Sequence, residues 1–312
     1  MSRFSEFTQL IRDHQIITIF RHSRPDCDAS GSQFGLKNWI EENFPEKTVL
    51  AAGEETCSQG SFPSSDPLDD DTIRKSIAFV LDTANTDRID DKRAMQAKLV
   101  IKIDHHPDRE PFGDFSYVDP EAAAVCQILT EWLTSEKDYK LSDKTAKYLY
   151  SGLLTDTLCF RTSNTTAATL KAAATLADTG IDIPGINREL FDVSVNEFNF
   201  GNYIRTHAQL CDDTAIVVLT NNDLEQWKIS GSDARNHIDE IGHIREMKVW
   251  AVFTETADGA MYDGSLRSKY AAVNEIAARY NGGGHRNAAG VKNMTPQQLQ
   301  EIIIELKNAA RS

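Results

Sequence analysis

Short hydrophobic runs alternate with amphipathic segments along the first third of the chain. Residues 16–20, 48–51, 77–81 and 99–103 are rich in Ile, Val, Leu, Phe and Ala, and their length is typical of buried strands. Amphipathic patterns such as residues 35–42 lie between these runs. Strands that alternate with helices predict right-handed βαβ units, and therefore a mostly parallel sheet with helices on both faces.

Helical patterns dominate the chain over residues 121–179. Apolar residues recur at helical spacing over residues 122–135, 142–154 and 165–179, which we expect to be helices. These segments extend the first domain beyond its strands.

The last part of the chain mixes strand-like and helical segments. We expect strands over residues 214–220 and 249–254, a hairpin near residues 257–259, and helices over residues 271–280 and 295–310. This pattern predicts a second, smaller α/β domain.

A change in composition near residues 196–213 indicates a domain boundary. We expect an N-terminal domain over residues 1–192, a linker helix region over residues 193–212 and a C-terminal domain over residues 213–312. A chain of 312 residues is long enough for both domains to bury a core of their own.

Acidic residues outnumber basic ones. Asp and Glu total 47 against 33 Lys and Arg, so the formal net charge is −14. This balance argues against binding of long duplex nucleic acid or of an anionic membrane, because both require clustered Lys and Arg. A small anionic substrate bound through a metal ion is compatible with it.

Membrane and secretion signals are missing from the sequence pattern. No apolar run is long enough for a transmembrane helix, and the first residues lack the apolar core of a signal peptide. The five cysteines are scattered, odd in number and never arranged as C-x-x-C. We therefore expect a reduced, cytoplasmic protein.

Asp and His residues follow directly after three of the predicted strands. The carboxyl ends of neighbouring parallel strands meet at one edge of a sheet, which is the usual ligand site. We therefore expect these side chains to lie together, with one more acid from the end of the helix over residues 142–154. The residues are His22, Asp26 and Asp28 after the first strand, Asp82 after the third, Asp104, His105 and His106 after the fourth, and Asp156.

These side chains offer oxygen and imidazole ligands, which suit Mn²⁺, Mg²⁺ or similar ions. Asp82 is short and could bridge two ions, as in sites that clamp a phosphoryl group. A single Asp at a strand end is more often a helix N-cap or a turn residue. Several acids at one edge would repel one another without cations, however, so their joint arrangement favours a metal site. Cys27 lies between two candidate ligands, and we expect it to pack in the core.

Four segments, in order, resemble the motifs of the DHH phosphoesterase superfamily: residues 22–32 (HSRPDCDASGS), Asp82-Thr83, Asp104-His105-His106 and Asp156. Two C-terminal segments, residues 265–268 (SLRS) and 282–290 (GGGHRNAAG), resemble the associated DHHA1 domain. The resemblance implies a catalytic, metal-binding DHH domain followed by a substrate-binding DHHA1 domain, with the active-site cleft between them.

The resemblance also implies two divalent metal ions, with Mn²⁺ expected and Mg²⁺ or Co²⁺ as alternatives. One ion would be held by His22, Asp26 and Asp82. The other would be held by Asp28, Asp82, His105 and Asp156.

Three residues take catalytic roles in this resemblance. His106 would face the substrate phosphate and assist the leaving group, Asp104 would orient the neighbouring imidazole, and Asp82 would bridge the ions. The chain departs from the family pattern at Cys27, where glycine is usual, and at Ser30, where an aliphatic residue is usual.

The second domain carries the candidate substrate-binding residues. Gly282, Gly283 and Gly284 would let the backbone approach an anion, although the same run could be a flexible turn. Arg267 could form a two-pronged contact with a terminal phosphate. Ser265 and His285 complete the set by resemblance.

The two-domain layout resembles the bacterial oligoribonucleases that are also pAp phosphatases, the nanoRNase type. It implies hydrolysis of short oligoribonucleotides (nanoRNA) to mononucleotides and dephosphorylation of 3′-phosphoadenosine 5′-phosphate (pAp), by hydroxide that two metals activate. The partners would be short RNA and small nucleotides, without long duplexes or membranes, and a homodimer is left open. A soluble phosphodiesterase for cyclic dinucleotides or linear pApA is the alternative. A non-catalytic nucleotide-binding regulator is a third reading.

Overall fold

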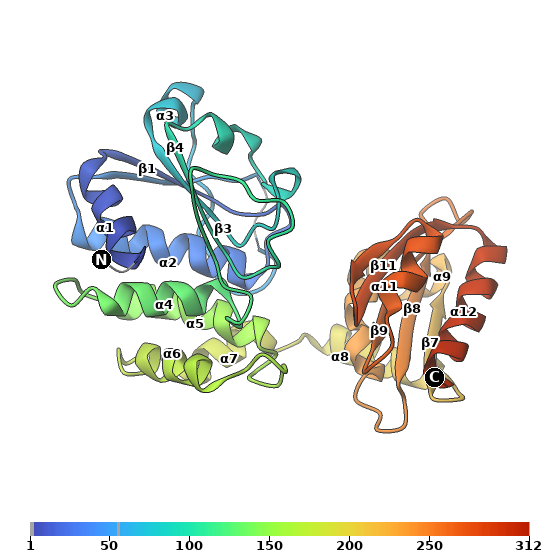
Figure 1. The fold of residues 1–312 in the computed structure, drawn as a ribbon. Coiled ribbons are helices and arrows are strands. Elements are labelled where there is room, and N and C mark those ends of the chain that lie inside the picture. The colour runs from blue at the N-terminus through green and yellow to red at the C-terminus, as the bar shows by residue number, and fades with distance from the viewer. Residues whose placement is uncertain (1–2, 55–56, 312) are drawn as a thin grey trace. The chain divides into compact units, whose positions relative to one another are not determined.

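A computed structural model describes residues 3–54 and 57–311, and the chain divides into two compact units, residues 1–192 and 193–312. Each unit is built around its own sheet (Figure 1). The strands of the first unit are β1 (Ile16–Phe20), β2 (Thr48–Ala51), β3 (Ile77–Leu81), β4 (Leu99–Asp104) and β5 (Phe115–Val118). Its helices are α1 (Arg3–Asp13), α2 (Cys27–Asn43), α3 (Asp70–Lys75), α4 (Val125–Ser135), α5 (Asp143–Asp156), α6 (Ala167–Ala177) and α7 (Ile183–Phe191), with short 3₁₀ turns η1 (Thr86–Arg88) and η2 (Lys92–Gln96).

The sheet of the first unit is parallel, with the strand order β2-β1-β3-β4-β5. This confirms the predicted parallel sheet, and β1, β2 and β3 have the predicted bounds. β4 continues one residue further, to Asp104, and the short edge strand β5 was missed because its half-exposed residues form no hydrophobic run.

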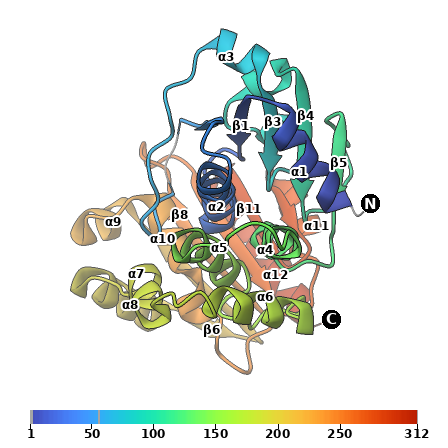
Figure 2. The same cartoon turned by 90° about the vertical axis from the view of Figure 1, so that its left-hand side faces the viewer.

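Both faces of this sheet are covered. Along β3, Phe79 and Leu81 pack with α1, α2, α4 and α5. On the other face, the cluster around Ala78 and Val80 includes residues of α3 and η2 and the residue after η1, Ile89. Strands buried on both faces read as continuous hydrophobic runs, which explains why the prediction succeeded here. Figure 2 shows α2 and α4 nearly end-on, on the same side of the sheet.

The helix α2 is longer than its amphipathic pattern indicated, because most of its residues from Cys27 to Ile40 are buried. Its small residues allow close contact with α5: a Cβ placed on Gly31 would lie 2.5 Å from the carbonyl oxygen of Tyr148. A helix that is buried on nearly all sides has no polar face, so the alternation of polar and apolar residues predicts only part of its length. The contact with α5 sets the distance between the two helices that carry candidate ligands.

The second unit contains a mixed sheet with the strand order β10-β11-β9-β8-β7-β6. β7 and β8 are parallel and the other neighbours are antiparallel. The strands are β6 (Gln209–Cys211), β7 (Thr214–Leu219), β8 (Val249–Glu255), β9 (Tyr262–Ser268), β10 (Gly283–His285) and β11 (Ala288–Met294). The helices are α8 (Val195–His207), α9 (Asn221–Trp227), α10 (Gly231–Asn236), α11 (Val273–Ala277) and α12 (Pro296–Arg311), with 3₁₀ turns η3 (His237–Ile241) and η4 (Ala278–Tyr280).

Helices also cover both faces of the second sheet. α11 and α12 pack on one face around Phe253 and Leu266, and α8, α9 and α10 pack on the other around Val217 and Val252. The structure thus confirms a second, smaller α/β unit. Within the region predicted as a linker, α8 buries Phe200 in the core of this unit.

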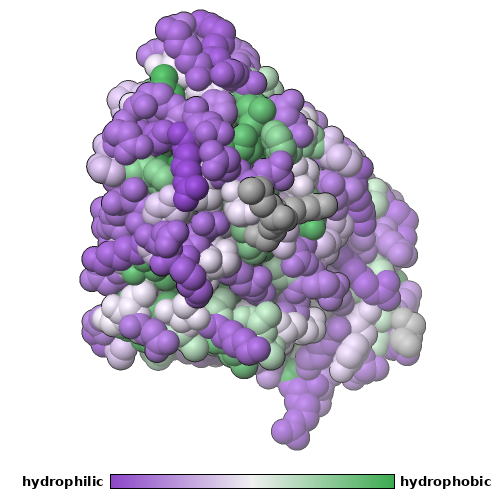
Figure 3. All heavy atoms as spheres, turned by 60° about the vertical axis from the view of Figure 1, so that its left-hand side comes forward, coloured by the Kyte–Doolittle hydropathy of each residue, from purple (hydrophilic) through white to green (hydrophobic). Residues whose placement is uncertain are grey.

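The face in Figure 3 is largely hydrophilic, and its hydrophobic residues form small, separate patches. Within the described part of the chain, no helix combines the length and the apolar character that crossing a membrane requires.

Candidate active site

The carboxyl edge of the first sheet brings the predicted side chains together. His22 follows β1, Asp82 follows β3, and His105 and His106 follow β4. These three strands are neighbours in a parallel sheet, so their carboxyl ends lie side by side. Asp82 has a left-handed backbone, with φ of 51°, which Asp tolerates better than most residues.

His22, Asp26 and Asp82 form the first group. The Nε2 atom of His22 lies 3.6 Å from Oδ2 of Asp26 and 3.4 Å from Oδ2 of Asp82. The other ring nitrogen of His22 lies 2.9 Å from the carbonyl oxygen of Ser23, which leaves Nε2 for the carboxylates. Ligand atoms of all three side chains lie within 4.8 Å of one another, so the group could hold a metal ion.

Asp26 also has the simpler role that its position predicts. It is the N-cap of α2, where its Oδ1 accepts hydrogen bonds from the amides of Asp28 and Ala29, both at 3.0 Å. Its Oδ2 faces His22 instead. The helix cap therefore orients this side chain towards the first group rather than competing with it.

Asp28, His105 and Asp156 form the second group, again with ligand atoms within 4.8 Å of one another. The Nε2 atom of His105 lies 3.4 Å from Oδ2 of Asp156 and 3.5 Å from Oδ1 of Asp82. Its Nδ1 lies 3.2 Å from the carbonyl oxygen of Ala122, which orients the ring. Asp82 thus directs one carboxylate oxygen to each group.

Asp28 is completely buried and connects the second group to the fold. Its two carboxylate oxygens accept hydrogen bonds from the amides of Val125, at 2.7 Å, and Cys126, at 2.9 Å, in the first turn of α4. The N-cap residue of α4, Ala124, makes no capping hydrogen bond through its side chain. Asp28 therefore caps a helix that lies far away in the sequence, and each of its oxygens keeps a second lone pair for a cation.

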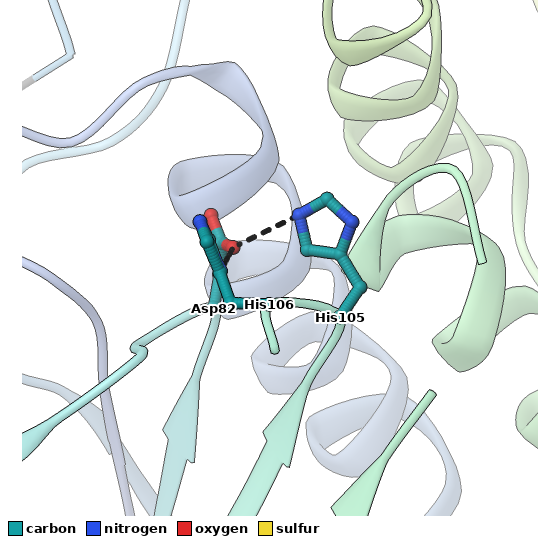
Figure 4. Close-up of side chains that lie close together, drawn as sticks. All are labelled: Asp82, His105 and His106. Atoms are coloured by element: carbon teal, nitrogen blue, oxygen red, sulfur yellow. Dashed lines mark ion pairs between the residues drawn. The ribbon is translucent and has the colours of Figure 1, made fainter. Parts of the chain in front are cut away.

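His106 lies beside the two groups and is oriented by Asp104. Its Nδ1 is 2.9 Å from Oδ1 of Asp104 and 3.5 Å from Oδ1 of Asp82. The same oxygen of Asp104 accepts the backbone amides of His105, at 2.9 Å, and His106, at 3.2 Å. Figure 4 shows the carboxylate of Asp82 with both histidines.

The charged groups of the site shift one another's pKa values. Burial lowers the pKa of His22, but Asp26 and Asp82 outweigh burial and raise it to about 10. Burial likewise lowers the pKa of His105, and Asp82 raises it to about 10. For Asp82 itself, burial raises the pKa, but His105 and His22 lower it well below its usual value.

The acids of the second group are less well compensated. Burial and the charge of Asp82 raise the pKa of Asp28 to about 6. Burial, Asp28 and Asp82 raise the pKa of Asp156 well above its usual value. Both shifts show that positive charge is in short supply around these carboxylates.

A divalent cation fits this donor set. The Oδ1 atom of Asp82 is buried and has no hydrogen-bond partner among the described residues. Two ligand atoms that share one ion at about 2.0–2.2 Å lie about 3.0–3.5 Å apart, close to the nitrogen–oxygen distances found here. Cys27 directs its sulfur elsewhere, 3.8 Å from the sulfur of Cys57, so the donors are oxygen and imidazole nitrogen.

In the second unit, the candidate substrate-binding residues lie together on neighbouring strands. Ser265 pairs with Gly290, which pairs in turn with Gly283. Arg267 pairs with Ala288 in the same register. Directly opposed residues share a face of a sheet, so Ser265 and Arg267 lie on the face that Gly283 leaves open.

The remaining glycines and His285 belong to the same edge of the sheet. Gly284 has a φ of 138°, and a Cβ there would lie 2.5 Å from the carbonyl oxygen of Ala288, so only glycine fits. Gly282 precedes β10, and the backbone of His285 pairs with that of Ala288. Gly283 and Gly284 are therefore part of the edge strand β10, and Gly282 directly precedes it.

One charged residue of the site escaped the sequence analysis. Lys102 lies inside β4, fully buried, with its Nζ 3.5 Å from Oδ2 of Asp104. The available signal was a lysine within a strand expected to be buried on both faces.

Comparison with known proteins agrees with this arrangement. The family model for the DHH family, N-terminal domain, matches residues 16–153, and the model for the DHHA1 domain matches residues 212–312. A probable bifunctional oligoribonuclease and PAP phosphatase NrnA of Streptococcus mutans is 35% identical, over 99% of both chains. The bifunctional oligoribonuclease and PAP phosphatase NrnA of Bacillus subtilis is 33% identical, over 97% of this chain and 98% of its own.

A solved structure supports the fold. The crystal structure of an exopolyphosphatase-related protein from Bacteroides fragilis superposes with a TM-score of 0.86 at 23% identity, covering 100% of this chain and 98% of that one. The matches to both family models confirm the resemblance of the sequence motifs to the DHH and DHHA1 domains. The protein therefore belongs to the DHH family of phosphoesterases, with a DHHA1 domain as its C-terminal unit.

Proposed function

We propose that the protein is a two-metal phosphoesterase that hydrolyses short oligoribonucleotides to mononucleotides and dephosphorylates pAp. One observation carries the proposal: Asp82 directs Oδ2 to His22 at 3.4 Å and Oδ1 to His105 at 3.5 Å, so a single carboxylate serves both groups. The relatives named as bifunctional oligoribonucleases and PAP phosphatases support this choice of substrates.

In this proposal His22, Asp26 and Asp82 hold one ion, and Asp28, Asp82, His105 and Asp156 hold the other. Imidazole and carboxylate donors favour Mn²⁺, with Mg²⁺ and Co²⁺ as alternatives. When bound, the two ions supply an activated water and neutralise charge on the phosphate oxygens.

The protein residues position the reacting groups. Asp104 holds Nδ1 of His106 and orients the ring. In this proposal His106, protonated on Nε2, donates that proton to the leaving oxygen, as a general acid oriented by a carboxylate.

The second unit selects the substrate. The guanidinium of Arg267 binds a terminal phosphate, and the open backbone at Gly283 lets a nucleotide approach closely. Burial lowers the pKa of Arg267, but a guanidinium keeps its charge at neutral pH. A few contacts of this kind suit a short nucleotide, whereas the net charge of −14 disfavours a long one.

A substrate panel tests the proposal. The purified protein is given pAp, a dinucleotide, a five-residue RNA, cyclic-di-AMP and pyrophosphate, each with Mn²⁺ and with Mg²⁺. We expect turnover of pAp and the short RNAs that requires metal. Linear pApA is the dinucleotide of the panel. Cleavage of cyclic-di-AMP or of pApA that is much faster than the turnover of pAp would instead assign a dinucleotide phosphodiesterase.

Asp82→Asn tests the bridging role in the same panel. We expect loss of metal-dependent turnover, because the variant removes a negative ligand from both groups. Asp87→Asn is the matched control, since Asp87 is exposed and its ion pair with Lys92 is 3.6 Å long. Full activity of Asp82→Asn, or of the wild type after removal of all divalent metal, would rule out the two-metal mechanism.

A further inference from the structure

Lys102 is an unusual residue for its place in the fold. It lies in the middle of β4, between Val80 of β3 and Ser116 of β5, and none of its side chain is exposed. Lysine is almost never completely buried unless its charge is paired. The neighbours of this buried ammonium must therefore compensate its charge.

The ammonium of Lys102 has three oxygen neighbours. Its Nζ donates hydrogen bonds to Oδ1 of Asp108, at 2.9 Å, and to the carbonyl oxygen of Ala84, at 3.1 Å. The third direction leads to Oδ2 of Asp104, at 3.5 Å. The ammonium also lies 4.8 Å from the ring centre of Phe112.

Asp104 divides its two oxygens between different neighbours. Oδ1 accepts the amides of His105 and His106 and faces Nδ1 of the His106 ring. Oδ2 is buried, has no hydrogen-bond partner among the described residues, and has Lys102 as its cationic neighbour within 4 Å. The carboxylate is thus held at one end by the histidine segment and at the other by a positive charge.

This arrangement has an energetic reason. Asp104 has no exposed surface, and an ionised carboxylate in such a place is costly unless a positive charge compensates it. Lys102 supplies that charge from the side opposite to His106. Because the ammonium comes from a strand of the sheet rather than from a loop, its position is well defined.

We propose that Lys102 is a positioning residue for phosphoester hydrolysis, acting through Asp104 on the ring of His106. The inference rests on the proposed function, because it needs His106 to assist the leaving group. Lys102 itself touches neither the substrate nor a metal ligand. Lys102 holds the carboxylate of Asp104, which in turn holds the ring of His106.

The first test is steady-state kinetics of the full-length, Mn²⁺-loaded Lys102→Met variant on pAp and a dinucleotide. We expect kcat to fall by about 10- to 100-fold, the usual effect of losing an outer-shell partner, while KM and Mn²⁺ affinity stay at the wild-type values. Lys147→Met is the matched control, because it removes a lysine whose ion pair is with Glu189 of α7 and not with a residue of the site. A Lys102→Met variant with wild-type kcat, or with a raised KM alone, overturns the proposal.

A double-mutant cycle separates positioning from general stability. If Lys102 acts through His106, Lys102→Met combined with His106→Gln has the same kcat as His106→Gln alone. If the double variant instead loses kcat by the product of the two single losses, Lys102 has another role and the inference is overturned. Lys102→Gln, which keeps hydrogen-bond donors, is the second variant. Failure of both Lys102 variants to fold, judged by circular dichroism, assigns the lysine to the fold and also overturns it.

Nuclear magnetic resonance of ¹⁵N-histidine-labelled, Mg²⁺-loaded protein keeps this test separate from the proposed function. We expect Lys102→Met to change the ring signals of His106 and to leave those of His22 and His105 in place. If the wild type hydrolyses none of the panel, the proposed function fails, and this spectrum still decides whether Lys102 orients His106. Unchanged His106 signals overturn the inference.

Discussion

Gly152 controls the distance between the two helices that carry Asp28 and Asp156. It lies in α5, one turn before Asp156, and faces the start of α2. A Cβ at this position would lie 2.5 Å from the sulfur of Cys126, 2.8 Å from Cα of Asp28 and 2.8 Å from the carbonyl oxygen of Cys27. Gly152→Ala therefore forces backbone atoms beside a proposed metal ligand to move.

The size of the effect follows from these distances. An ordinary contact begins at 3.4 Å, so the backbone of α2 must retreat by about 0.6 Å. Misplacement of reacting groups on the scale of 1 Å can cost about 100-fold in rate, so we expect kcat to fall by about 10- to 100-fold. Overpacking costs about 1–3 kcal/mol, and the better helix propensity of Ala returns about 1 kcal/mol. The free energy of unfolding should therefore fall by only about 0–2 kcal/mol.

The assay compares kcat on pAp, Mn²⁺ affinity by calorimetry and the midpoint of urea unfolding for wild type and Gly152→Ala. Ser151→Ala is the control in the same helix, since it removes a hydroxyl that bonds to the carbonyl oxygen of Lys147 and adds no atom. We expect Ser151→Ala to keep its kcat. Wild-type kcat and Mn²⁺ affinity in Gly152→Ala would refute the claim that this contact sets the ligand geometry.

Three further predictions concern the metals and the second unit. The pKa values of His22 and His105 are raised to about 10 each, so Mn²⁺ must displace protons from these rings when it binds. The affinity for Mn²⁺ should therefore rise between pH 6 and 9, by about tenfold per pH unit for each proton released. An affinity that does not depend on pH contradicts the ligand assignment. Calorimetry in buffers of different ionisation enthalpy counts those protons. Arg267→Ala should raise KM for pAp by about 10- to 100-fold without changing Mn²⁺ affinity, because one charge-assisted phosphate contact is lost, and an unchanged KM argues against docking. Gly284→Ala should lower the free energy of unfolding, measured by urea titration, by about 1–3 kcal/mol, because φ is 138° and the new Cβ meets a carbonyl oxygen. An unchanged free energy of unfolding contradicts the strain argument.

The hydrophobic pattern predicted the strands correctly where both faces of the strand are buried. β1 and β3 are buried on both faces, so their hydrophobic runs coincide with the strands themselves. The start of α2 at Cys27 was missed, since a helix enclosed by the sheet and α5 has too few polar positions to show a period. The short edge strand β5 depends on pairing with a distant segment, which periodicity does not register. The helix predicted over residues 271–280, in contrast, is present as α11 and η4.

The identity of the groups that reach the site follows from their order along the chain. Strand ends are set by local hydrophobicity, and a parallel sheet brings the carboxyl ends of neighbouring strands together, so Asp82 and His105 could be expected at one edge before any coordinates. The contacts that hold each group, in contrast, arise only when distant segments pack together. Asp28 caps α4 across 97 positions of sequence, and the buried charge of Lys102 faces Asp104 within a closed core. Such contacts depend on distances of a few ångströms between packed elements, and a one-dimensional pattern contains no information about them.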